Sequence, residues 1–350
     1  MKPPWESGRG RWHLPLAELA YRAGVRLKRL SYDMGLRRIE RVPVPVICVG
    51  NLTVGGTGKT PAVIAIARRL AEWGKRPAIV SRGFGGAKTD DEILLVSPTE
   101  SDWRRVGDEA LLTARMLPKV PVFVGVNRAA AARRAIEQRA ADVIVLDDGF
   151  QHWRFARDVD VVLLDGTEPV GNGHLLPRGP LREPVSALHR ADLIVLTKSN
   201  LAEEAGAWAQ RLSTRLHAPV VQAIHRPMRL WDLAKGEAHD LTELRGKRVV
   251  SASGLARNES FQSLLRASGA EVEAALDFAD HQDYAATQWE MIRRVVRESG
   301  DVTLVTTAKD AVKWTQADIE GLTVWVLEIE FEVSVGAERF WNALRMAVNR

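Results

Sequence analysis

The sequence has little cysteine and no long apolar run. Cys48 is the one cysteine in 350 residues, which excludes an internal disulfide and is typical of a reducing compartment. The N-terminus has prolines and arginines in place of the apolar segment of a signal peptide, and no apolar stretch is long enough to cross a bilayer. The eight histidines lack the spacing of zinc ligands, so we expect no zinc site. These absences predict a soluble or peripheral protein.

What is present is an ordinary globular composition with an excess of basic residues. Hydrophobic residues make up 46% and charged residues 27% of the chain, whose length suffices for two α/β domains. The net charge of +5 suits nucleic acid, an anionic membrane surface or an acidic substrate.

Residues 14–41 are basic, because arginines and lysines outnumber the acids there, and the spacing of the leucines predicts an amphipathic helix. Aromatic residues are interleaved with the arginines and lysines. An interfacial helix on anionic headgroups has this composition. A helix packed on the protein's own surface, with a solvated basic face, has it too, and both alternatives stay open.

A glycine-rich turn between an apolar strand (44–49) and a helix (62–70) carries the strongest functional signal. Glycines let backbone N–H groups close around an anion, and the first turn of the helix adds partial positive charge. Lys59 would reach the β- and γ-phosphates and the Thr60 hydroxyl would ligate Mg²⁺, although the general motif has glycine where Thr53 stands. We expect nucleotide phosphates to be bound by Thr53, Val54, Gly55, Gly56, Thr57, Gly58, Lys59 and Thr60.

After this turn, apolar strands alternate with helices. The predicted strands are 78–80, 122–124, 143–146, 161–164 and 193–196. Such alternation predicts an α/β fold with a P-loop NTPase-like, doubly wound, mostly parallel sheet that binds ligands at the carboxyl ends of its strands. A second, smaller α/β pattern follows. We divide the chain into a basic N-terminal helix (1–41), a phosphate-loop domain (42–224), a linker hairpin with Gly236 at its tip (225–244) and a C-terminal α/β domain (245–350).

Two carboxylates follow the strand 143–146. Asp147 and Asp148 match the strand-end carboxylate that holds Mg²⁺ and its waters in phosphate-loop enzymes. Asp165 ends the next strand and competes for this role, but we favour the doubled carboxylate.

Several isolated residues are ambiguous when taken singly. Arg82, Arg128 and Arg182 each follow a strand or a glycine-rich turn, where guanidinium groups suit phosphate recognition, although each could be a solvated surface residue. Asp108 lies in the first turn of a predicted helix, which is usual for a capping acid. His281 precedes another helix, where a histidine is more often structural than catalytic.

Taken in order along nearly the whole chain, these residues resemble the tetraacyldisaccharide 4′-kinase family of lipid A biosynthesis. The motifs are Gly50-Asn51-Leu52-Thr53 through Gly58-Lys59-Thr60-Pro61, Ser81-Arg82-Gly83-Phe84-Gly85-Gly86, Gly107-Asp108-Glu109, Asp147-Asp148-Gly149-Phe150-Gln151-His152, Gly171-Asn172-Gly173, Asp280-His281 and Lys309-Asp310-Ala311-Val312-Lys313. The family also has threonine at the position of Thr53. It usually has proline where Ala110 stands and glutamate where Ala308 stands.

The resemblance implies MgATP-dependent phosphorylation of the 4′-hydroxyl of a lipid disaccharide 1-phosphate by a peripheral enzyme at the cytoplasmic face of the inner membrane. It also implies two α/β/α domains joined by a two-stranded linker. By position, Asp108 would be the catalytic base with His281 as its partner and Lys59 at the phosphates, and Mg²⁺ would lie near Thr60, Asp147 and Asp148. Candidate residues for substrate binding are Arg82, Arg128, Gln151, His152, Asn172 and Arg182. An anionic membrane surface is the expected partner, with no nucleic acid and no obligate protein partner.

Two other classes of protein remain as alternatives. A regulatory GTPase or metallochaperone would need Asn/Thr-Lys-x-Asp after a strand, and the stretch Thr197-Lys198-Ser199-Asn200 lacks the Asp. A nucleic-acid-binding ATPase would fit the basic charge, but that charge clusters in the N-terminal helix and no nucleic-acid module accompanies it.

Overall fold

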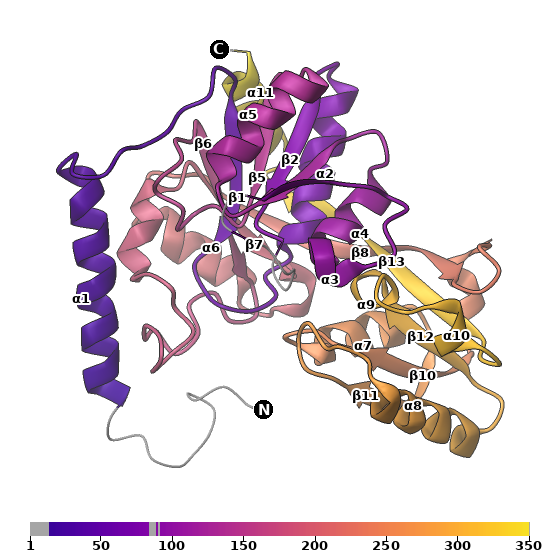
Figure 1. Cartoon of the computed structure of the whole chain (residues 1–350). Helices are drawn as coiled ribbons and strands as arrows, with labels where there is room; N and C mark the ends of the chain where they lie inside the picture. Colours follow the sequence, from indigo (N-terminus) through magenta and orange to yellow (C-terminus); the bar gives the residue numbers. More distant parts are fainter. Residues whose placement is uncertain (1–13, 84–88, 90–91, 350) are drawn as a thin grey trace.

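Figure 1 presents the computed structural model of the chain, which describes residues 14–83, 89 and 92–349. Helix α1 (Leu14–Asp33) stands beside the main body, as its position at the left of Figure 1 makes plain. The helix predicted over 14–41 ends at Asp33, because Gly35 follows with a φ of 70°, a conformation typical of the residue after a helix. Residues 1–13 of the predicted N-terminal part, and Phe84, Gly85 and Gly86 of one motif, lie outside the described residues.

The phosphate-loop domain is built on parallel strands that lie side by side in an order different from their order in the sequence. In order across this part of the sheet, neighbouring strands are β7 (Leu193–Thr197), β6 (Val159–Asp165), β1 (Val46–Asn51), β5 (Val143–Asp147), β2 (Pro77–Ser81) and β4 (Val122–Gly125), with β3 (Ile93–Val96) antiparallel at the edge. This is the doubly wound sheet predicted from the sequence, and the fold class is confirmed.

Side chains of β1 alternate between two cores, because successive residues of a strand point to opposite faces. Ile47 and Val49 pack against helices α2 (Lys59–Glu72) and α4 (Asp108–Met116), while Cys48 faces α5 (Arg128–Arg139) as the buried apolar residue expected of it. The other helical segments of this domain are α3 (Trp103–Val106), η2 (Val185–Arg190), η3 (Ser199–Leu201) and α6 (Ala205–Ser213).

The C-terminal domain repeats the two-faced arrangement on a smaller scale. Strands β11 (Glu271–Asp277), β10 (Arg248–Ser253) and β12 (Thr303–Thr307) are parallel, with α7 (Asn258–Ala267) on one face and α8 (Ala286–Ser299) on the other. Three short segments complete it: η4 (Leu241–Leu244), α9 (Ala308–Ala311) and α10 (Gln316–Ile319).

Two long antiparallel strands, β8 (Val220–Asp232) and β13 (Val324–Val335), join the two domains into one sheet. In Figure 1 both strands run from the phosphate-loop domain to the orange C-terminal domain. The predicted hairpin around Gly236 forms between β8 and the short β9 (Ala238–His239), but the main partner of β8 is β13, about a hundred residues further along the chain. The alternating pattern of β8 does not identify so distant a partner.

The end of the chain returns to the phosphate-loop domain. Helix α11 (Ala337–Val348) follows β13, and its Phe340 and Leu344 belong to the same buried cluster as Ile66 of α2. Lys75 donates a hydrogen bond to the backbone oxygen of Val348. This packing differs from the prediction that residues 245–350 form one C-terminal domain, because β13 carries the chain back across the linker before α11 begins.

Candidate active site

The glycine-rich turn lies between β1 and α2 in a conformation that only glycine adopts easily. Gly55 and Gly58 have φ values of 111° and 81°. A Cβ on Gly58 would also lie 2.4 Å from Nε2 of His225, so no side chain fits there. Asn51 donates a hydrogen bond of 2.7 Å to the backbone oxygen of Thr53, which fixes the start of the turn.

Lys59, the first residue of α2, faces an acidic side chain at the end of β5. Its Nζ lies 3.8 Å from Oδ1 of Asp148. Arg182 Nη1 donates to both oxygens of Asp148 at 2.9 Å. Burial alone would raise the pKa of Asp148, but the charges of Lys59 and Arg182 outweigh burial and the pKa is lowered. The three predicted residues therefore lie together.

Asp147, which precedes Asp148 at the end of β5, is buried. Its Oδ2 accepts a hydrogen bond from Ser81 at 3.3 Å, whereas Oδ1 has no partner among the described residues. Burial, and then the negative charge of Glu109, raise its pKa to about 7. A buried carboxylate oxygen without a partner suits a hard divalent cation such as Mg²⁺. The neighbouring residue Asp148 lines the same cavity as Thr60. The residues present therefore fit the metal.

Asp165, the competing strand-end carboxylate, has protein partners at both of its oxygens. Lys198 Nζ lies 2.8 Å from its Oδ2, and Thr167 donates to Oδ1 through both its backbone N–H and its hydroxyl. Lys198 also donates to the backbone oxygen of Gly56. These contacts favour the doubled carboxylate as the metal site.

Asp108 and His281, 173 residues apart in the sequence, meet between the domains. Asp108 begins α4 with 1% of its side chain exposed, and His281 follows β11 with its Nδ1 at 2.9 Å from Oδ2 of Asp108. Lys313 Nζ lies 3.6 Å from the same oxygen. Burial would raise the pKa of Asp108, but the hydrogen bond from His281 and the nearby positive charges lower it. Burial would likewise lower the pKa of His281, and Asp108 raises it.

The buried Arg128 and the half-buried His152 form a second polar group. Arg128 Nη1 lies 3.1 Å from His152 Nδ1, and Arg128 Nε has no partner among the residues described. Burial and then the charge of Arg128 lower the pKa of His152 to about 3, so its imidazole is neutral. The positive charge of Arg82 acts on Arg128 from nearby. This is a basic cluster whose guanidinium groups suit an anion.

Of the last two predicted residues, Gln151 contacts distant parts of the chain and Asn172 contacts its own loop. Gln151 donates to the backbone oxygen of Asn51 at 3.0 Å and lies 3.5 Å from Arg182. Asn172 is exposed and bonds the backbone of Arg178 and His174, so it shapes its own loop.

Lys309 is a residue of the site to which the sequence analysis assigns no role, although its motif is visible in the sequence. Its Nζ lies 3.1 Å from Glu109 of the phosphate-loop domain, 2.9 Å from Asp280 and 3.4 Å from Nε2 of His281. Burial would lower its pKa, but the surrounding carboxylates raise it. Arg257 makes a second contact between the domains, donating to Thr167 at 2.6 Å and pairing with Glu168. A sequence pattern identifies such residues but not the partners they meet.

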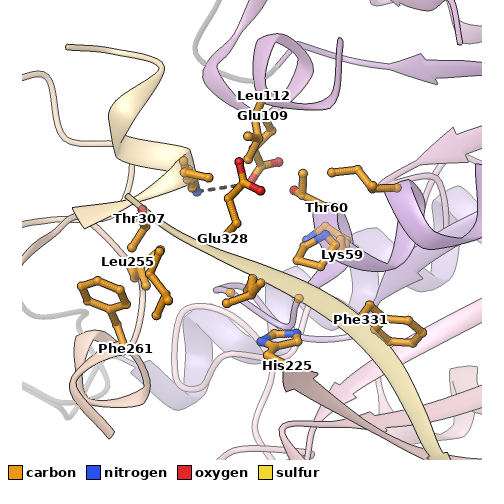
Figure 2. Close-up of a pocket in the computed structure, with 18 of the residues that line it drawn as sticks. Lys59, Thr60, Glu109, Leu112, His225, Leu255, Phe261, Thr307, Glu328 and Phe331 are labelled. Atoms are coloured by element: carbon orange, nitrogen blue, oxygen red, sulfur yellow. Dashed lines mark ion pairs between the residues drawn. The ribbon is translucent and has the colours of Figure 1, made fainter. Parts of the chain in front are cut away.

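A cavity of about 1040 Å³ lies between the domains and opens onto the phosphate loop. Figure 2 shows Lys59, Thr60 and Glu109 on one side and Leu255 and Phe261 on the other. His281, Asp148 and Arg182 also line it. A polar end and apolar walls suit a nucleotide, whose phosphates are charged and whose base is flat and apolar on its faces.

Comparison with known proteins identifies the family of the chain. The family model described as tetraacyldisaccharide-1-P 4′-kinase matches residues 10–349. The chain is 45% identical to the tetraacyldisaccharide 4′-kinase of Anaeromyxobacter dehalogenans strain 2CP-C, over 95% of this chain and 89% of that protein. It is 41% identical to the protein of the same name from Syntrophus aciditrophicus, over 91% and 88%.

A solved structure agrees in fold as well. The crystal structure of LpxK from Aquifex aeolicus, described as an "apo" form in complex with ATP, is 29% identical and superposes with a TM-score of 0.76 over 97% of this chain and 99% of that one. The match spans both domains and includes the phosphate loop. The chain belongs to the tetraacyldisaccharide-1-P 4′-kinase family.

Proposed function

We propose that this chain transfers the γ-phosphate of ATP to the 4′-hydroxyl of a tetraacyldisaccharide 1-phosphate in lipid A biosynthesis. The observation that carries the proposal is the pairing of Asp108 with His281 at the cavity that also contains the phosphate loop. Phosphoryl transfer needs positioning and charge stabilisation more than covalent chemistry from the protein. The family membership supports the same reaction and weighs against a regulatory GTPase.

The donor side of the reaction belongs to the phosphate loop. Backbone N–H groups of residues 53–60 and the Lys59 ammonium would bind the phosphates of ATP. Thr60, Asp147 and Asp148 would hold Mg²⁺, which when bound neutralises charge on the β- and γ-phosphate oxygens. The unpartnered oxygen of Asp147 supports this assignment.

Asp108 would accept the proton of the sugar hydroxyl as the general base. His281, held positive by Asp108, would keep that carboxylate ionised and oriented. Because Asp108 is buried beneath His281 in this arrangement, the acceptor sugar would enter before the domains close around it. Closure would exclude water and limit idle hydrolysis of ATP.

The acceptor side is basic. We assign the substrate phosphate to Arg82, Arg128 and Arg182, because guanidinium groups bind phosphate through paired hydrogen bonds. The buried Nε of Arg128 is available for such a bond. Gln151 and His152 would bind the sugar, and Asn172 would contribute by shaping the loop that presents Arg182.

The acyl chains of the proposed substrate and the exposed helix α1 support binding at a membrane surface. Leu19 and Leu27 of α1 are 62% and 66% exposed, next to basic side chains. Within the part of the chain that the structure describes, we find no helix with the length and apolarity needed to span a bilayer. We therefore assign the protein to peripheral binding at an anionic membrane, on the cytoplasmic face where ATP is available. One chain supplies both members of the dyad, so no obligate protein partner is needed.

The test is transfer of radiolabel from [γ-³²P]ATP to a detergent-dispersed tetraacyldisaccharide 1-phosphate. Label in the lipid, lost in Asp108→Asn, supports the proposal. Label released only as inorganic phosphate, with lipid present, would contradict it. Competition by unlabelled GTP as strong as that by ATP would revive the GTPase alternative.

A further inference from the structure

Helix α1 is exposed along most of its surface but inserts one acidic side chain into the body of the protein. Glu18 is 5% exposed, whereas Leu16 and Leu19 on either side of it are 69% and 62% exposed. A carboxylate is buried only where it is paired and hydrogen-bonded. Its partners therefore indicate what the helix is attached to.

All but one of the partners of Glu18 lie in the loop 171–182. Its Oε1 accepts from the backbone N–H of Leu175 at 3.2 Å, and its Oε2 lies 3.3 Å from both Arg178 Nη1 and His174 Nδ1. Arg22 of the same helix completes the group at 3.1 Å. One turn further along the helix, the hydroxyl of Tyr21 donates to the backbone oxygen of Arg182 at 3.0 Å. The helix thus contacts this loop in its middle, at residues 174–178, and at its end, at Arg182.

The same loop is bonded to the phosphate loop. The N–H of Val54 donates to the oxygen of Pro180 at 2.8 Å, and the N–H of Arg182 donates to the oxygen of Leu52 at 2.9 Å. The side chain of Arg182 then binds both oxygens of Asp148. A continuous series of short contacts therefore runs from Glu18 to the residues that face Lys59.

We propose that Glu18 is a positioning residue: through the loop 171–182 it holds Arg182 and the first limb of the phosphate loop in place, so that the attachment of α1 sets the affinity for MgATP. The helix then has two roles, since its exposed leucines face outward and its one buried carboxylate contacts the loop 171–182. The inference rests on the proposed function of the phosphate loop, but not on the identity of the phosphate acceptor.

The test measures MgATP binding by the full-length protein without lipid, using calorimetry or a fluorescent ATP analogue. Glu18→Ala should raise the dissociation constant for MgATP by roughly threefold to thirtyfold, the range of coupling through packed and hydrogen-bonded networks. Hydrogen–deuterium exchange should increase in residues 174–182. Asp33→Ala is the matched control, because it removes another carboxylate of α1, whose ion pair is with Arg29 of the same helix, and should change neither quantity.

Three further variants separate positioning from general destabilisation. Glu18→Gln keeps an oxygen for the N–H of Leu175 and should recover part of the lost affinity. Tyr21→Phe removes only the bond to the Arg182 backbone and should weaken MgATP binding about twofold, which covers the case in which Glu18→Ala does not fold. In a double-mutant cycle, Glu18→Ala and Arg182→Ala should be strongly non-additive.

Two results would overturn the inference. The first is wild-type MgATP affinity and wild-type exchange in Glu18→Ala, Glu18→Gln and Tyr21→Phe. The second is full additivity with Arg182→Ala. Failure of the proposed function looks different, since wild-type protein would then bind MgATP but leave the lipid unlabelled, and the Glu18 measurement would stand.

Discussion

The pairing of Asp108 with His281 can be tested by replacing each residue alone and both together. His281 Nδ1 lies 2.9 Å from a carboxylate that is 1% exposed. A hydrogen bond to a charged group contributes about 1.5–3 kcal/mol, so His281→Ala should lower kcat by roughly 10- to 150-fold. Asp108→Asn removes the base itself and should lower kcat by roughly 10²- to 10⁴-fold.

The pH dependence of kcat tests the direction in which Asp108 and His281 shift each other's pKa. Despite its burial, Asp108 has a lowered pKa because His281 and nearby cations stabilise its charged form. Activity that needs ionised Asp108 is lost as the pH falls through that lowered pKa. Without His281 the pKa rises, so the acid limb of the kcat profile should move to higher pH. The raised pKa of His281 means that activity needing imidazolium is lost as the pH rises through it, and this basic limb should disappear in His281→Ala.

The assay is label transfer to lipid as a function of pH, with MgATP binding measured in parallel. Residues that act as a unit give non-additive losses, so the double variant should be little worse than the worse single variant. MgATP should still bind in all three proteins, because neither residue belongs to the phosphate loop. Fully additive losses, or an acid limb that does not move in His281→Ala, would refute the dyad.

Three other predictions follow from the site and the helix. Lys59→Ala should lower kcat by roughly 10²- to 10³-fold with an unchanged circular dichroism spectrum, because it removes a charged donor to the transferred phosphate; near-normal transfer would contradict the assignment. Asp147→Asn should weaken Mg²⁺ binding in the presence of ATP and raise the melting temperature of the metal-free protein at about pH 8, because it removes a buried carboxylate with an unpartnered oxygen; an unchanged Mg²⁺ affinity would place the metal elsewhere. Replacing Leu19 and Leu27 by serine should weaken co-sedimentation with anionic vesicles by at least about tenfold, since burying each leucine contributes about 1.5–3 kcal/mol; unchanged sedimentation would mean that α1 does not enter the lipid.

The sequence by itself determined the features that depend on neighbouring residues. The phosphate loop is a local structure, because a strand, a glycine-rich turn and a helix N-terminus follow one another within residues 46–72. The position of Asp147 at the end of its strand is also a local feature. The ordered motifs also allowed the family to be predicted, and the comparisons confirmed it.

The tertiary structure decided the features that depend on distant partners. The motifs suggested His281 as the partner of Asp108, but their contact depends on how the two domains close. The pairing of β8 with β13, and the packing of α11 against the phosphate-loop domain, likewise depend on contacts between segments far apart in the sequence.

Glu18 is the clearest case of a residue whose role the sequence conceals. In the sequence it is one acid in a basic amphipathic helix, and the helical period places it beside exposed leucines. Its burial depends on the loop 171–182, more than 150 residues away, which supplies a backbone N–H and a guanidinium to its carboxylate. Periodicity describes which residues share a face of a helix. Only the folded chain determines what that face meets, because the free energy of a buried charge depends on partners that the rest of the chain brings to it.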